Sequence, residues 1–311
     1  MNKRHPPLPP ALVLIIGIMA VSTASVFIRY AQQDAPSLVI AAGRLTVAAL
    51  VLAPVALLRR RDELAHLTRA QLGLALLSGT LLAIHFATWI SSLEYTTVAS
   101  SVVLVSTTPL WVAILTPILL KEKIQHATVI GMAAALIGGA VVALSDSCAW
   151  EAARLVCPDP STFIKGEAFS GDLLALAGAL AAAGYILIGR RLRAGISLIS
   201  YILVVYSAAA VVLVVWMLSL GLQPFGLPPQ TYVWILLLGL VPQLIGHSSF
   251  NWALGYLSAA YVAITLLGEP IGSTVLALIL LGETPSGIKI LGGVMILIGI
   301  AIASRSSSSP A

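Results

Sequence analysis

The sequence predicts an all-α polytopic membrane protein in which ten transmembrane helices form two inverted five-helix repeats. The composition, ten apolar segments and an internal repeat support this prediction. Of the 311 residues, 59% are hydrophobic and only 9% are charged, whereas an average soluble domain has about 25% charged residues. So few charges cannot cover a soluble protein. The composition therefore excludes a soluble globular enzyme, a disordered chain and a nucleic-acid-binding domain.

Ten apolar segments follow one another, each close to the ~20 residues that a transmembrane helix needs. They cover about 10–30, 36–58, 71–91, 98–120, 126–145, 171–189, 198–220, 231–252, 258–282 and 286–304. We expect helices because the segments are about twice the length of a barrel strand and show no alternation. The first segment has an alternative interpretation as a cleaved signal peptide, which the repeat described below disfavours.

The positions of the basic residues predict the orientation. If the N-terminus is cytoplasmic, the inner segments contain Lys3, Arg4, Arg59, Arg60, Arg61, Arg69, Lys121, Lys123, Arg190, Arg191, Arg193 and Arg305. The outer segments contain only Arg29, Arg154, Lys165 and Lys289. Cytoplasmic loops are enriched in Lys and Arg. We therefore expect a multi-pass protein of the inner (plasma) membrane with both termini cytoplasmic, and we expect Trp89 in an aromatic belt at the outer interface.

The segments divide the chain into four parts. Residues 1–145 form the first five-helix repeat, 146–170 an extracytoplasmic loop, 171–304 the second repeat and 305–311 a disordered tail. The loop contains both cysteines, Cys148 and Cys157. An oxidising compartment favours a disulfide between them, and two unpaired thiols are the alternative.

A shift of 161 residues aligns the two halves without a gap over about 60 positions. Internal sequence repeats of this kind are found in many transporters that consist of two inverted repeats. The matched pairs include Tyr95 with Tyr256, Pro109 with Pro270, Glu122 with Glu283, Gly131 with Gly292, Gly138 with Gly299, and Arg29 with Arg190. Each half has five spans, so two similar halves in one chain must insert with opposite orientations. This arrangement is typical of secondary transporters with a central site that alternates between the two sides.

Several motifs of the second half carry a family resemblance. They are Gly268-Glu269-Pro270, the run from Leu281 to Ser286 (LGETPS), Gly292-Gly293 and Gly299. This pattern resembles the second repeat of an EamA-type transporter of the drug/metabolite transporter superfamily. The resemblance implies a ten-helix fold and the transport of small metabolites, often amino acids, without ATP. One departure is that the first repeat has Thr108 where the second has Glu269, so the carboxylate is not duplicated.

Two charged residues lie deep within the predicted spans, where polar groups are costly. Glu269 lies about 16 Å along its helix at 1.5 Å per residue, directly before Pro270. It is either a carboxylate that titrates protons or binds a substrate amine, or a structural carboxyl beside the proline break. Arg44 either binds a substrate carboxylate, pairs with Glu269 as a gate, or extends outward to interfacial water.

The other candidate residues for substrate binding or coupling are polar and aromatic. Gln243, His247 and Asn251 have i, i+4 and i+8 spacing, which predicts one helix stripe that faces the bundle. This stripe either lines the substrate path or forms hydrogen bonds with a neighbouring helix. The corresponding helix of the first half carries His85. Because the two halves are inverted, we expect His85 toward the outer side of its helix and His247 toward the inner side of its own. Trp111, beside Thr108, is a candidate for the cavity wall.

The sequence therefore predicts a secondary active transporter of small organic metabolites that works by alternating access, with export favoured over uptake. We expect a small-molecule substrate and the lipid bilayer as partners and no cofactor, and leave proton coupling and a homodimer open. A channel or a structural membrane subunit is the alternative. A membrane enzyme is disfavoured because the sequence lacks His-Glu-x-x-His, a phosphate-binding Gly-rich loop and Gly-x-Ser-x-Gly.

Overall fold

The computed structural model describes residues 6–120, 126–147, 149–151, 154–156 and 165–306. Within these ranges, eight spans are long and apolar enough to cross a membrane. They are Pro10–Ala31, Ser37–Arg59, Arg69–Tyr95, Val98–Leu119, Glu167–Arg193, Leu198–Ser219, Pro229–Ala253 and Ala259–Leu281. Two shorter apolar stretches, Val129–Val142 and Gly287–Gly299, coincide with the two remaining predicted segments. The chain is a multi-pass helical membrane protein, which confirms the predicted class.

The described part of the first half contains eight helices, seven in the five apolar segments and one, α4, between two of them. These are α1 (Pro10–Ser22), α2 (Ala24–Ala31), α3 (Ser37–Arg59), the short α4 (Arg61–Ala65), α5 (Arg69–Tyr95), α6 (Val98–Val105), α7 (Thr108–Leu120) and α8 (His126–Ser147). The second half contains α10 (Glu167–Arg193), α11 (Leu198–Ser219), α12 (Pro229–Leu238), the π-helix η1 (Gly239–His247), α13 (Ser248–Ala253), α14 (Ala259–Thr265), α15 (Gly268–Leu281) and α16 (Gly287–Ser306).

The fourth span of each half is broken at the same position of the repeat. Ser106 and Thr107 separate α6 from α7, and Leu266 and Leu267 separate α14 from α15. A proline follows each break within the first turn of the next helix, where its missing N–H is tolerated. Threonine hydroxyls bind carbonyl groups beside the breaks. Thr107 Oγ1 donates to Leu104 O (2.7 Å), Thr108 Oγ1 to Val105 O (2.8 Å) and Thr265 Oγ1 to Val262 O (2.7 Å).

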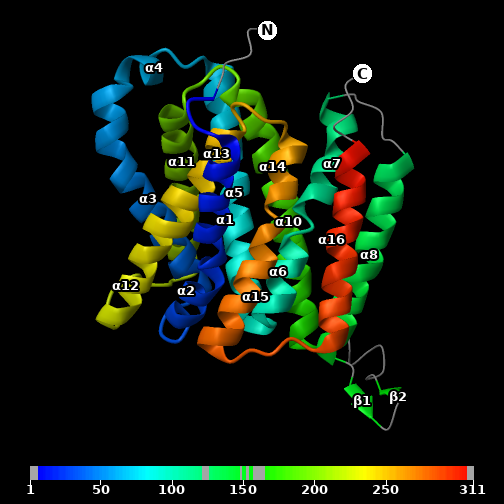
Figure 1. The fold of residues 1–311 in the computed structure, drawn as a ribbon. Helices are drawn as coiled ribbons and strands as arrows, with labels where there is room; N and C mark the ends of the chain where they lie inside the picture. Colours follow the sequence, from blue (N-terminus) through cyan, green and yellow to red (C-terminus); the bar gives the residue numbers. More distant parts are fainter. Residues whose placement is uncertain (1–5, 121–125, 148, 152–153, 157–164, 307–311) are drawn as a thin grey trace.

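The two halves are interleaved. The first span of each half packs against the third span of the other: α10 lies against α5, and α1 and α2 lie against α12, η1 and α13. The second spans, α3 and α11, pack together, as do the fifth spans, α8 and α16. Figure 1 shows α8 and α16 side by side at one edge of the bundle.

Glycines permit the closest approach between α8 and α16. A Cβ atom on Gly138 would lie 2.7 Å from the carbonyl oxygen of Gly292, and one on Gly299 would lie 2.5 Å from that of Gly131. The residue numbers rise along α8 as they fall along α16, so these equivalent helices are antiparallel. Each of the two contacts is the repeat image of the other, which is the pattern of an isologous interface around a two-fold axis.

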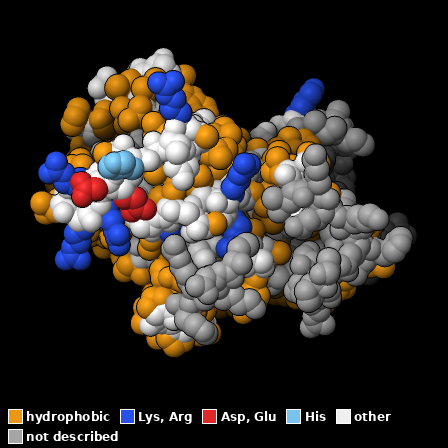
Figure 2. Space-filling view, turned by 90° about the horizontal axis from the view of Figure 1, so that it is seen from above, with side chains coloured by type: hydrophobic (Ala, Val, Ile, Leu, Met, Phe, Trp, Pro, Cys, Tyr) orange, Lys and Arg blue, Asp and Glu red, His pale blue; other side chains and the backbone are white. Residues whose placement is uncertain are grey.

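The ends of the bundle differ in the elements they carry. The start of α1, the end of α16 and helix α4 lie at one end, and a small hairpin of β1 (Ala149–Glu151) and β2 (Arg154–Val156) lies at the other (Figure 1). The strands are antiparallel, with Trp150 opposite Leu155. Figure 2 looks onto the α4 end, where Lys and Arg side chains are spread over the surface. The predicted disulfide residues, Cys148 and Cys157, lie outside the described residues.

Candidate functional site

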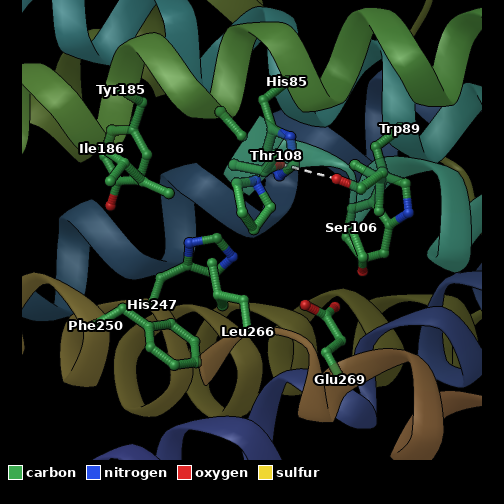
Figure 3. A pocket seen from close by; sticks show the side chains of 13 residues that line it. His85, Trp89, Ser106, Thr108, Tyr185, Ile186, His247, Phe250, Leu266 and Glu269 are labelled. Atoms are coloured by element: carbon green, nitrogen blue, oxygen red, sulfur yellow. Dashed lines mark hydrogen bonds between the residues drawn. The ribbon is translucent and has the colours of Figure 1, made fainter. Parts of the chain in front are cut away.

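A pocket lies between the two halves, at the level of the helix breaks (Figure 3). It holds about 600 Å³ of space between atoms, including the part that is open to solvent. The first half contributes His85, Trp89, Val105, Ser106, Thr108 and Pro109, and the second contributes Ala182, Tyr185, Ile186, His247, Phe250, Leu266 and Glu269. The structure thus brings His85, Thr108, His247 and Glu269 of the predicted set into one wall.

Glu269 is the charged residue of this wall. It lies in the first turn of α15, directly after the second break, and Figure 3 shows its carboxylate pointing into the pocket. Among the described residues, no hydrogen bond to the carboxylate and no salt bridge with it is found. Arg44 interacts with it electrostatically. The carboxylate is therefore available to a ligand or a proton.

Arg44 is fully buried behind the pocket wall rather than in it. Its Nε atom donates a 2.9 Å hydrogen bond to Oε1 of Gln243, and its guanidinium carbon lies 4.0 Å from the centre of the Phe86 ring. The interpretation in which this side chain extends outward to interfacial water is wrong, because none of the side chain is exposed. Within the described residues, Arg44 also makes no direct ion pair with Glu269. It is held by Gln243 and Phe86 instead.

The two histidines lie close together. Their ring centres are 6.2 Å apart, so any displacement of His85 toward the outer side and of His247 toward the inner side is small. The Nδ1 atom of His85 lies 3.0 Å from the carbonyl oxygen of Gly178. A carbonyl only accepts hydrogen bonds, so Nδ1 carries a proton, and in the neutral ring Nε2 is left as an acceptor.

Trp89 corrects another expectation. It is only 2% exposed and stacks on His85, with ring centres 5.8 Å apart, so it does not belong to an interfacial belt. The 161-residue offset pairs Trp89 with Phe250 and Val105 with Leu266, and all four residues line the pocket. Once Trp89 and Val105 are placed in the pocket, the repeat identifies Phe250 and Leu266 as their equivalents. Tyr185 and Ser106 carry no comparable signal.

Asn251 and Gln243 are buried and support the pocket from behind. Asn251 Nδ2 donates to the hydroxyl of Tyr185, a wall residue, and to that of Tyr206 at 3.3 Å. Ser248 links Tyr206 (3.3 Å) to the Gln243 backbone carbonyl (3.5 Å). The π-helix has a wider turn than an α-helix, so the three residues of the predicted stripe do not point the same way. His247 lines the pocket, whereas Gln243 and Asn251 face neighbouring helices. Trp111 is partly buried and does not line the pocket.

A polar junction closes the bundle near the end that carries the hairpin. Arg29 forms a 3.3 Å salt bridge with Glu283 and donates to Thr96 O at 2.8 Å. Glu283 also accepts a 2.8 Å hydrogen bond from the backbone N–H of Val98, at the start of α6. The repeat equivalent of Arg29, Arg190, likewise donates to the carbonyl oxygen at the end of the other third span, Leu254, at 2.7 Å. The arginine-to-carbonyl hydrogen bond is thus present in both halves, whereas Glu122, the repeat equivalent of Glu283, lies outside the described residues.

These features define the class of a two-repeat, multi-pass membrane protein with a largely apolar pocket between its repeats that contains one carboxylate. The model of the EamA-like transporter family matches residues 8–144 and 169–305. The chain belongs to the EamA-like transporter family, a group of membrane transporters for small molecules. A solved crystal structure that is 19% identical in sequence has a similar fold, with a TM-score of 0.67, and the match covers 96% of this chain and 99% of the other. No curated protein sequence matches significantly.

Proposed function

We propose that this protein is a secondary active transporter that moves small organic metabolites by alternating access around the Glu269 pocket. The observation that carries the proposal is the composition of the pocket wall, which both repeats supply next to their two equivalent helix breaks. Rocking one repeat against the other would change the access to such a site without moving the site itself. Broken helices are typical of transporter binding sites because the breaks free backbone and side-chain polar groups at membrane depth.

The antiparallel packing of α8 and α16 supports the inverted topology in this proposal. Two repeats that insert in opposite orientations are related by a two-fold axis, so their equivalent helices run antiparallel. We infer ten spans, with α8 and α16 as the fifth span of each repeat. The repeats extend over residues 1–145 and 171–304, with a loop at 146–170 and a tail at 305–311.

The orientation in the proposal follows from charge. Arg59, Arg60 and Arg61 are exposed at the end where α1 begins and α16 ends. An excess of basic residues is typical of the cytoplasmic side. We therefore place both termini in the cytoplasm and the hairpin of β1 and β2 outside an inner (plasma) membrane.

Reconstitution into liposomes tests the proposal. Purified protein should show saturable exchange of a labelled metabolite, sensitive to a pH gradient if Glu269 exchanges protons during the cycle. Glu269→Gln should abolish the dependence on the gradient, whereas Asp62→Asn, which changes an exposed carboxylate of α4, should leave exchange unchanged. Conductance that does not saturate would identify a channel instead, and turnover of the metabolite would identify an enzyme.

A further inference from the structure

We propose that the pocket selects organic amines in their ammonium form over the amino acids that carry the same side chain. This inference rests on the proposed function and names the substrate class of the same site. It contrasts with the amino-acid substrates that the family resemblance implies.

Three polar side chains of the wall, Glu269, His85 and Thr108, present hydrogen-bond acceptors. Glu269 presents a carboxylate without a hydrogen-bond partner among the described residues, and His85 presents Nε2 because its Nδ1 proton is bound to Gly178. Thr108 donates its hydroxyl proton to Val105 O at 2.8 Å, which leaves its oxygen lone pairs available. An ammonium group has three donors and no acceptor, so it can satisfy several of these groups together.

The described wall contains no Lys or Arg that could neutralise a ligand carboxylate. Arg44, the buried cation nearby, does not line the pocket: its Nε atom is bound to Gln243, and the Phe86 ring covers one face of its guanidinium group. A carboxylate that loses its hydration in a largely apolar pocket is strongly disfavoured without a cationic partner. Amino acids carry this group and the corresponding amines do not.

The remaining wall fits an apolar or aromatic ligand body. Trp89, Tyr185 and Phe250 supply ring surfaces, and ring faces also attract cations. The indole N–H of Trp89 is buried without a hydrogen-bond partner among the described residues. A neutral donor of this kind can bind a hydroxyl or carbonyl oxygen, but it does not neutralise the charge of a carboxylate.

Three matched pairs of ligands test the proposal with the full-length protein in detergent. They are phenethylamine and phenylalanine, tyramine and tyrosine, and isopentylamine and leucine. We expect isothermal titration to show that at least one amine binds, and that it binds at least about tenfold more tightly than its amino acid, since an unpaired buried charge is costly. The neutral alcohol 2-phenylethanol should bind more weakly than phenethylamine.

Two variants assign the preference to the carboxylate. Glu269→Gln should weaken amine binding at least about tenfold while Glu269→Asp, which keeps the charge, retains the preference. If no amine binds, or if an amino acid binds as tightly as its amine, the substrate class is wrong. The proposed transport function fails separately, when reconstituted protein shows no saturable exchange of any metabolite, including amino acids.

Discussion

The Nε atom of Arg44 donates a hydrogen bond of 2.9 Å to Oε1 of Gln243, which lies 199 residues further along the chain. The bond joins the second span of the first repeat to the π-helix of the second repeat. Gln243 is fully buried, and the two terminal amino groups of Arg44 have no hydrogen-bond partner among the described residues. Among the described residues, this is therefore the only hydrogen bond of the buried Arg44 guanidinium group.

Replacement of Gln243 by leucine should destabilise the protein by about 1–3 kcal/mol, because it leaves a buried donor unsatisfied. Gln243→Glu keeps an acceptor and adds a charge opposite to that of Arg44, so it should be destabilised less. The thermal unfolding midpoint of the purified protein in detergent measures both changes. Equal midpoints for Gln243→Leu and the wild type would contradict the role given to this bond.

The Arg29–Glu283 junction makes a prediction about charge exchange. Glu283 pairs with Arg29 and also accepts from the Val98 N–H. Arg29→Glu and Glu283→Arg should each lower the unfolding midpoint, and the double variant should recover only part of the loss. The exchanged arginine restores the ion pair but cannot accept from Val98. We expect a remaining loss of about 1 kcal/mol, typical of a lost helix cap. Complete recovery would show that the cap contributes nothing.

The glycine contact between α8 and α16 predicts a steric effect. Gly138→Ala places a methyl group 2.7 Å from the carbonyl oxygen of Gly292. It should destabilise the protein by about 1–3 kcal/mol, as overpacking does. Gly73→Ala is the matched control, because no atom lies within 4 Å of its added methyl group and alanine favours helix. Thermal unfolding should separate the two variants, and equal stability would contradict the close packing.

Glu63 in α4 predicts a dependence of stability on pH. It accepts hydrogen bonds from the backbone N–H of Ser197 (2.7 Å) and the hydroxyl of Ser200 (2.8 Å), at the start of α11. Partial burial alone would raise the pKa of Glu63, but the hydrogen bonds from Ser197 and Ser200 outweigh it and lower the pKa below its ordinary value of 4.5.

Because the pKa of Glu63 is lower in the folded than in the unfolded protein, its stabilising contribution is complete above pH 4.5 and is lost as the pH falls through the folded pKa. Glu63→Gln should therefore lose less stability than the wild type across this acidic range. Unfolding midpoints measured against pH test this, with Asp62→Asn as the control. Parallel curves for wild type and Glu63→Gln would exclude the linkage.

The cysteine pair remains a prediction. Cys148 directly precedes β1 and Cys157 directly follows β2 in the sequence, so the described hairpin joins their neighbours on both strands. We expect a membrane-impermeant maleimide to label intact cells only after reduction. Equal labelling before and after reduction would rule out the disulfide.

The apolar segments were sufficient to predict the helices, because hydropathy is a local property of the chain. The repeat aligned Gly131 with Gly292 and Gly138 with Gly299, but the contact of α8 with α16 was not predicted, because an alignment does not say which helices pack together. Glu269 could be singled out because a lone carboxylate in an apolar span is conspicuous. The place of Trp89 in the pocket could not be predicted, because a tryptophan near a span end suits an interface as well as a cavity. The π-helix around Gln243 also had no sequence signal beyond Pro242.

The isologous contact of Gly131 and Gly138 with Gly299 and Gly292 has a consequence for biogenesis. On a ribosome the first repeat emerges complete while its packing partner is still unmade. Until the second repeat is inserted, the surfaces of the first, third and fifth spans that later pack against it face lipid. In the proposed topology, an isolated five-helix unit would bury these surfaces only against a copy of itself inserted in the opposite orientation. A gene for half of this protein would thus need to produce both orientations, whereas the fused chain guarantees one of each.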